Sequence, residues 1–479
     1  MACSGLFFMV FSIWLIKRNI GAVVLHILTD IDEWRFITSM ALSSHSNTAL
    51  LTLALLAAPA MAESLPQAWQ QAEQYSHSLR AEARKVDAAR LQEDAAHAAA
   101  GPSLTLDAGL SQLDSTPTAR LDISPLTQGL GALGLHLPAT VDAPLSNRDV
   151  RYANARLGLP LYTGGKLTAL QQSAAAATSA SRYAREQVRQ ALRLQVAEAY
   201  VNVLRARHAA VVASQYLQSL QSYQRDVNNF FRKGVVARGD VLGAALAVAD
   251  AEQKQISARQ AETLSQAAYN RLLGRDFSQP VQLDELELAG DGRSLAALQQ
   301  RAMQQRPELA GLAQWSEALQ ANARSVRAES QPQLGVYAAY SYLNNPYLVN
   351  KGVGSVGLGL SWSVFDSGLI RARAGSVSEQ ATAVQDQLEE ARSLIALEVE
   401  RSHSQQIEAA ARIRVAEAAL LSADEYLAIQ RDRYRNGLAN QTEVLAAEAR
   451  RADSQRNLFN ARYDHALAVV ALQRAIGEL

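Results

Sequence analysis

Two acidic residues stand at the same distance behind a glycine, each followed by two aliphatic residues. The run Asp240-Val241-Leu242 begins six residues after Gly234, and the run Glu443-Val444-Leu445 begins six residues after Gly437. A glycine suits the left-handed end of a helix, and a carboxylate in the next helix's first turn complements its dipole. The pattern predicts two helical hairpins. Each carboxylate is then either a structural charge at a helix start or part of a functional site.

The remaining reactive side chains predict no catalysis. No two of the histidines beyond residue 62 have the spacing of metal ligands: His77, His97, His136, His208, His403 and His465. The glycine runs 129–134 and 352–357 spell a dinucleotide fingerprint, but neither is predicted to follow a strand and open a helix. We therefore expect no enzyme activity, no cofactor and no metal site.

Composition narrows the class of protein further. Lys and Arg total 46 and Asp and Glu total 46, so no basic surface indicates a nucleic-acid partner. Aromatic residues make up only 6% of the chain, and Cys3 is its single cysteine, which excludes a disulfide framework. Long stretches rich in Ala, Gln, Leu and Arg are typical of long helices.

The second half of the chain repeats the first in register. At an offset of 203 residues, Leu161–Gly165 matches Val364–Gly368, and Arg271–Gly274 matches Arg474–Gly477. Further upstream the offset rises to 230, so the first half carries 27 extra residues within 104–161, which predict a long extracellular loop. We predict a first structural repeat over 63–290 and a second over 291–479.

The N-terminal segment predicts export. Ala49–Ala58 is an apolar run of ten residues, and Pro59–Ala62 ends in small residues suited to cleavage after Ala62. Residues 40–62 are therefore expected to be a signal peptide, with residues 1–39 a misassigned extension. A membrane anchor within residues 1–39 is the alternative.

Each repeat predicts one very long helix followed by a second. Residues 166–230 contain neither Pro nor Gly, and the equivalent second stretch is 369–434. A helix of about 60 residues is about 90 Å long, more than one globular core needs. Apolar residues at steps of four and three form a coiled-coil seam in the first helix: Tyr216, Leu220, Tyr223, Val227 and Phe230.

Four shorter segments alternate apolar and polar residues, as strands do. They are centred on residues 104–110, 153–161, 334–342 and 356–364. Either they form an ordinary half-buried sheet, or they face lipid on one side and a lumen on the other. Four strands cannot close a barrel, and lipid does not tolerate open edges. If they span a membrane, several chains must share a barrel, and three chains supply 12 strands.

These features resemble the TolC-like outer-membrane efflux proteins. The resemblance covers residues 64–479 and rests on the duplicated layout, on the hairpin turns and on the following segments: Leu65–Trp69, Leu79-Arg80, Tyr162–Lys166, Gln305–Leu309 and Phe365–Gly368. It implies a mostly α fold with membrane β-structure, in which a homotrimer forms an α-helical barrel and a 12-stranded outer-membrane barrel. It also implies docking on a periplasmic adaptor and an inner-membrane pump, so that cargo leaves through a passive duct.

The resemblance assigns roles at the hairpin turns. Asp240 and Tyr434 match positions that pair across hairpins, and Glu443 matches an acidic position lining the periplasmic constriction. Ala439 and Ala446 stand where relatives carry an arginine and a second acidic residue. Either the latch is looser here, or Arg238 and Arg435 substitute. The expected adaptor contacts are Gly234, Gly437, Val241, Leu242, Val444 and Leu445. In the simplest alternative, the two glycines only end helices.

Three aromatic residues are expected at the membrane interface, namely Trp362, Tyr340 and Tyr342, although packing in a soluble sheet explains each equally well. The alternative function is a periplasmic coiled-coil adaptor or scaffold, which also has a signal peptide and long hairpins. Such an adaptor predicts one hairpin and a compact β domain, whereas this sequence predicts two hairpins and four alternating strands.

Overall fold

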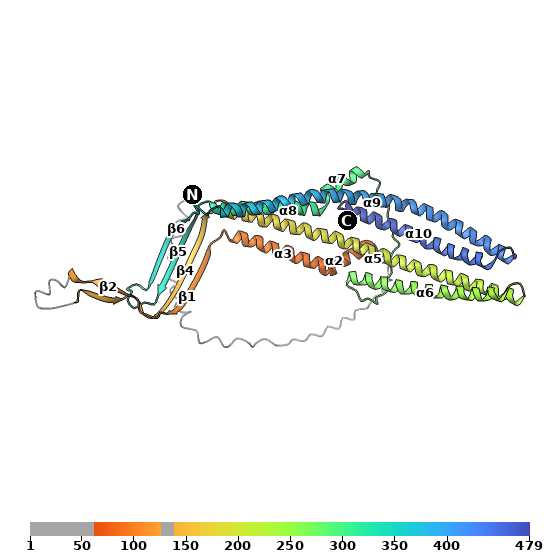
Figure 1. Cartoon of the computed structure of the whole chain (residues 1–479), viewed down its shortest axis with the longest axis horizontal. Helices are drawn as coiled ribbons and strands as arrows, with labels where there is room; N and C mark the ends of the chain where they lie inside the picture. The colour runs from red at the N-terminus through yellow and green to blue at the C-terminus, as the bar shows by residue number, and fades with distance from the viewer. Residues whose placement is uncertain (1–61, 126–137) are drawn as a thin grey trace, which may run out of the picture. The chain divides into compact units, whose positions relative to one another are not determined.

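The computed structural model describes residues 62–125 and 138–479. Apart from Ala62, the predicted signal peptide and the extension 1–39 lie outside these residues, as does the glycine run 129–134. Within the described ranges, each half of the chain contains two helices, a strand pair and a long helical hairpin (Figure 1).

The two halves have the same element order. The first half comprises α2 (Leu65–Tyr75), α3 (His77–Ala98), β1 (Ser103–Gln112), β4 (Asp149–Tyr162), α5 (Lys166–Arg232) and α6 (Arg238–Leu273). The second comprises α7 (Leu295–Gln305), α8 (Pro307–Arg327), β5 (Gln333–Leu343), β6 (Gly352–Ser361), α9 (Leu369–Arg435) and α10 (Gln441–Ala475). The 3₁₀ turn η1 (Ala328–Ser330) precedes β5. A separate hairpin of β2 (Thr118–Asp122) and β3 (Thr140–Pro144) lies within residues 104–161, where the first half is longer than the second.

The long helices α5 and α9 have 67 residues each, and both of their ends fall at the predicted offset. At 1.5 Å per residue each is about 100 Å long. Each follows a glycine in the left-handed region, Gly165 at φ 87° and Gly368 at φ 84°, which turns the chain from strand to helix. The predicted long helices are confirmed. No helix in residues 62–125 and 138–479 is both long and apolar enough to cross a bilayer.

The four longer strands form one antiparallel sheet in the order β1-β4-β5-β6. The register places Leu106, Ala155, Tyr340 and Gly354 side by side across it, so the predicted apolar positions share one face. The opposite face carries most of the polar residues together with several glycines and tyrosines, and there Arg156 lies over the Tyr337 ring at 5.7 Å. The predicted alternation is therefore correct. Many of the apolar side chains remain exposed in the single chain, as at Leu106 (66%).

The last predicted strand is shorter than expected. The alternation in the sequence predicts a strand through Trp362 and Val364, but β6 ends at Ser361. The Trp362 indole donates to the Ser330 carbonyl at 3.0 Å instead. Asp366 then accepts the amides of Gly368 and Ile370, at 3.0 and 2.7 Å, so the chain has already turned to start α9.

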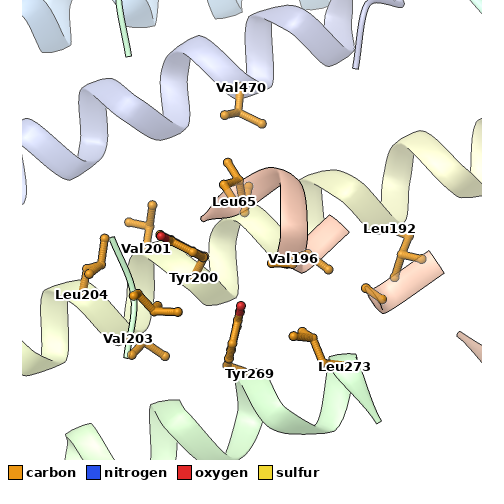
Figure 2. Close-up of a cluster of buried hydrophobic side chains, with 14 of the residues drawn as sticks. Leu65, Leu192, Val196, Tyr200, Val201, Val203, Leu204, Tyr269, Leu273 and Val470 are labelled. Atoms are coloured by element: carbon orange, nitrogen blue, oxygen red, sulfur yellow. The ribbon is translucent and has the colours of Figure 1, made fainter. Parts of the chain in front are cut away.

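The largest core cluster lies where α2, α3, α6 and the segment 275–294 pack against α5 and α10 (Figure 2). Tyr200 of α5 is 1% exposed, and its ring meets that of Tyr269 edge-on at 6.1 Å. Its hydroxyl oxygen lies 2.7 Å from the Glu63 carbonyl and 2.8 Å from the Asp284 carbonyl. One buried tyrosine thus joins the start of the described chain to the segment that connects the two halves.

Candidate functional site at the hairpin turns

The two hairpins end in the same kind of turn. Gly234 has φ 74° and Gly437 has φ 73°, a region that disfavours other residues. The Val235 amide donates to the Phe230 carbonyl at 2.9 Å, which closes the helix end, and the equivalent bond closes the second turn. A Cβ atom at either glycine would meet nothing within 4 Å, so the backbone angle alone requires glycine. The predicted helix-ending role of both glycines is confirmed.

Asp240 lies in the first turn of α6 and is half-buried. Its carboxylate accepts the Ala237 amide at 3.1 Å, so it caps the helix as the structural alternative predicted. Its carbonyl accepts a hydrogen bond from the Gln441 side chain at 2.8 Å, which joins the first hairpin to the second. Asp240 thus has a structural role within one chain, and its role in a gate stays a prediction.

Glu443 occupies the matching place in α10, but its carboxylate does not cap the helix as that of Asp240 does. Asn440 caps this helix by accepting the Glu443 amide at 3.0 Å. The Glu443 side chain is half-buried, and it makes no hydrogen bond or ion pair with another residue of the described ranges. Its carboxylate is therefore available for interactions outside the chain.

Tyr434 packs against the first hairpin. Its ring lies 5.4 Å from that of Tyr223 and 6.1 Å from that of Phe230, both on α5. Its hydroxyl is buried beside that of Tyr223 and makes no hydrogen bond with the Asp240 carboxylate. Within one chain the predicted pairing of Tyr434 with the Asp240 carboxylate is thus not formed, and the role of Tyr434 in a gate stays a prediction.

The expected adaptor-contact residues divide by exposure. Val444 is fully buried, and Val241 and Leu445 pack half-buried beside it in the cluster between the hairpins. Leu242 is 61% exposed, and Leu438, which was not predicted, is 69% exposed. Because Val444 lies at the packing interface, it holds the hairpins together in this structure and does not face a partner.

An ion pair with a buried carboxylate lies one turn further from the hairpin ends, and it was not predicted from the sequence. Glu448 of α10 is 1% exposed, and Arg431 of α9 donates to its carboxylate through Nε at 2.8 Å. Ser219 of α5 donates to the other carboxylate oxygen at 2.9 Å. Glu448 follows buried Val444 by four residues, so an acidic residue within an apolar seam was the available signal. The network ties both hairpins together.

A second cluster holds the connecting segment 275–294 against the long helices. The Glu285 carboxylate accepts hydrogen bonds from Tyr463 at 2.9 Å and Arg207 at 2.5 Å, and the His208 Nε2 lies 3.0 Å away. Burial acts to raise the pKa of Glu285, but these hydrogen bonds together outweigh burial and leave the pKa below its ordinary value. His208 also stacks on Phe459, with ring centroids 4.1 Å apart.

The predicted interface aromatics lie at the two ends of the sheet. Tyr340 and Tyr342 pair with Gly354 and Gly352 near the β5–β6 connection, on the apolar face. Trp362 follows β6 at the opposite end, next to the helices, and is 56% exposed. Their contact with lipid headgroups stays a prediction. In the described ranges, no group of three or more His, Cys, Asp or Glu side chains is placed to hold a metal ion.

The fold and these turns define a class: a duplicated protein with two long helical hairpins and a four-stranded sheet that is apolar on one face. The sequence profile of the outer membrane efflux protein family matches residues 68–275 and 298–478. The chain belongs to this family. It is a channel of the outer membrane that serves efflux or secretion and extends into the periplasm.

Individual proteins agree with the family match. The chain is 26% identical to outer membrane protein TolC of Vibrio cholerae serotype O1 over 384 residues, which cover 78% of this chain and 86% of that protein. It is 25% identical to alkaline protease secretion protein AprF of Pseudomonas aeruginosa over 306 residues, or 60% of this chain and 62% of that one. The crystal structure of outer membrane protein VceC from Vibrio cholerae matches with a TM-score of 0.70 at 19% identity, over 86% of this chain and 96% of VceC.

Proposed function

We propose that three copies of this chain form one passive duct through the outer membrane and across the periplasm. Their sheets would join into a 12-stranded barrel, and their six hairpins would form a helical tube. A periplasmic adaptor and an inner-membrane pump would supply cargo and energy. The observation that carries this proposal is the sheet, which has one apolar face and two open edges.

The strand order supports closure by identical copies. In the order β1-β4-β5-β6 every neighbour is antiparallel, so the edge strands β1 and β6 run in opposite directions. The β6 edge of one copy is therefore suited to antiparallel pairing with the β1 edge of the next. Repeated around an axis, such head-to-tail contacts close a ring and leave no unpaired edge in lipid.

The hairpin turns are the proposed gate at the periplasmic end. In a trimer, three Glu443 carboxylates surround the axis, where they repel one another and attract cations. Tyr434 and Asp240 would pair across hairpins and hold the constriction closed.

The exposed ends of the hairpins are the proposed adaptor contact. Gly234 and Gly437 lie in the turns that join the two helices of each hairpin, and Leu242 and Leu438 offer exposed apolar side chains. Apolar side chains on a periplasmic surface are suited to a partner protein. The adaptor would pack on these residues and draw the hairpins apart.

Assembly is tested by cell fractionation followed by SDS-PAGE of the outer-membrane fraction with and without boiling. We expect a heat-dissociable trimer in that fraction. A soluble periplasmic monomer would contradict the shared barrel and the gate together.

The Glu443 ring is tested by single-channel recording in planar bilayers. We expect wild-type channels to prefer K⁺ over Cl⁻, and Glu443→Gln to bring the permeability ratio close to one, because the ring loses its charge. Glu425→Gln, on an exposed face of α9, is the control and should leave the ratio unchanged. An unchanged ratio in Glu443→Gln would remove Glu443 from the constriction.

A further inference from the structure

The connecting segment 275–294, which joins α6 to α7, is extended over its middle part (Figure 1). Residues 284–292 contain no helix, turn or bend. Exposed and partly buried positions alternate here: Glu285, Glu287 and Ala289 are exposed, whereas Leu286 and Leu288 pack against the largest core cluster. An alternation with a period of two is that of a β-strand. This part of the segment therefore has the conformation of a strand.

One end of this strand-like stretch already pairs with another part of the chain. Glu63 forms an isolated parallel bridge with Leu283. Its amide donates to the Gln282 carbonyl at 2.8 Å, and its carbonyl accepts the Asp284 amide at 3.1 Å. Beyond this bridge, the backbone of residues 285–290 makes no hydrogen bond in the part of the chain that the structure describes. A row of unpaired N–H and C=O groups is a template for a further strand.

A groove of about 650 Å³ lies along this unpaired stretch. Five consecutive residues, from Glu285 to Ala289, line it, so the groove follows the main chain and not only alternate side chains. The long helices supply much of its remaining lining, with apolar surface at Ile413 of α9 and Phe459 of α10. The volume is in the range of about 300–1,000 Å³ that is typical of ligand sites.

The charged side chains of the groove are largely paired, so charge does not select its occupant. Arg462 donates to the Glu417 carboxylate at 3.0 Å, and the Glu285 carboxylate is held by the hydrogen bonds described above. Of the charged lining residues, Glu287 alone has no ion pair within the described ranges. The half-buried His465 also lines the groove. The groove therefore offers main-chain donors and acceptors beside apolar surface, which suits an uncharged peptide.

We propose that the connecting segment binds an extended, uncharged peptide of a partner protein, which adds a strand along residues 285–290. The free amides and carbonyls hold the peptide main chain, and one of its apolar side chains enters the groove beside Ile413 and Phe459. The bridge to Glu63 is a precedent within the chain, because it joins an extended backbone to the same segment.

The position of the site indicates where the partner lies. Tyr200, whose hydroxyl contacts the Asp284 carbonyl, is 34 residues from the start of α5 at Lys166 and 32 from its end at Arg232. At 1.5 Å per residue the site is about 50 Å along the helix from the strands, and therefore in the periplasm. It lies within one chain and far from the hairpin turns, so it does not depend on the proposed trimer, gate or adaptor contact.

The test is fluorescence polarisation of a fluorescein-labelled peptide with the purified full-length protein, at constant detergent concentration. The peptide is Thr-Val-Thr-Phe-Thr-Val-Thr with a blocked C-terminus, which is uncharged, favours an extended backbone and carries one aromatic side chain. We expect saturable binding. A second peptide, N-methylated at both valines and the phenylalanine, should bind at least about tenfold more weakly, because those amides can no longer donate.

A pair of variants tests the same contact from the protein side. Ala289→Pro removes one main-chain donor from an exposed position and keeps an extended backbone, so it should weaken binding several-fold. Ala289→Ser keeps the amide and is the matched control, which should bind as the wild type does. Circular dichroism of both variants verifies that the helices are retained.

Three outcomes would overturn the proposal. Absence of saturable binding by the wild type would mean that the groove takes no extended peptide. Equal binding of the two peptides would mean that it takes apolar groups without pairing to a strand. Equal binding by Ala289→Pro and Ala289→Ser would mean that the peptide lies elsewhere on the protein.

Discussion

Glu448 shows how much one buried charge depends on its partners. Its carboxylate is enclosed among three helices and is compensated by Arg431 and Ser219. Such a pair adds little net stability over apolar packing, but removing one partner leaves an uncompensated charge. The ion pair therefore selects one arrangement of the two hairpins, because only this packing gives the Glu448 carboxylate its hydrogen-bond donors.

Replacing Arg431 by alanine should lower the free energy of unfolding by about 3 kcal/mol, because Glu448 then stays buried without its counter-charge. Denaturant titration of the purified protein measures the loss. The double variant Arg431→Leu, Glu448→Leu should recover most of it. Arg414→Ala, an exposed change on the same helix, is the control and should shift stability by less than about 0.5 kcal/mol. A loss as small as that of the control would contradict the role of the pair.

The lowered pKa of Glu285 predicts that the stability of the folded protein falls at acidic pH. Its pKa is lower in the folded protein than in the unfolded chain, so its stabilising effect is complete above the ordinary value of about 4.3. The effect is lost as the pH falls through the lower, folded-state pKa. We expect the midpoint of thermal unfolding to drop between about pH 5 and pH 3, with a shallower drop in Glu285→Gln. Glu287→Gln, an exposed change in the same segment, should keep the wild-type slope; equal slopes in all three proteins would contradict this account.

At the scale of elements, the regular parts of this chain were predictable and their contacts were not. The helix α5 follows from a long run without Gly or Pro, and the strand faces follow from a period of two. The burial of Val444 and the exposure of Leu242 were not predictable, because equivalent positions in the two hairpins meet different neighbours once the hairpins pack. The gate and adaptor roles came from family resemblance and remain predictions.

The left-handed glycines at the hairpin turns predict how much stability a hairpin loses when such a glycine is replaced. Gly437→Ala should cost about 1–2 kcal/mol, because alanine is strained at φ 73° although space is available. Gly239→Ala, in the first turn of α6 with no atom within 4 Å, is the matched control and should be neutral or slightly stabilising. Chemical unfolding of both variants measures their free energies of unfolding relative to the wild type. Equal stability of the two variants would show that the second turn does not need its left-handed residue.

At the scale of the whole molecule, the sheet gives the sharpest test, because its two faces differ so strongly. Val356 is 63% exposed on the apolar face, near the middle of β6, while its neighbour Ser355 points to the polar face. Val356→Arg should cost about 2–4 kcal/mol at the bilayer midplane and reduce the outer-membrane trimer seen by SDS-PAGE. Ser355→Arg should assemble normally, and equal assembly of both variants would contradict a lipid-facing sheet.

The equal length of α5 and α9 restricts which insertions and deletions this chain can accept during evolution. Both have 67 residues, so both turns lie at the same distance from the sheet. Deleting seven residues from α5 alone would keep its seam in phase but withdraw one turn by about 10 Å. Insertions and deletions in the two halves should therefore be retained in matched pairs. Although the halves have diverged in sequence, they must still evolve together in length.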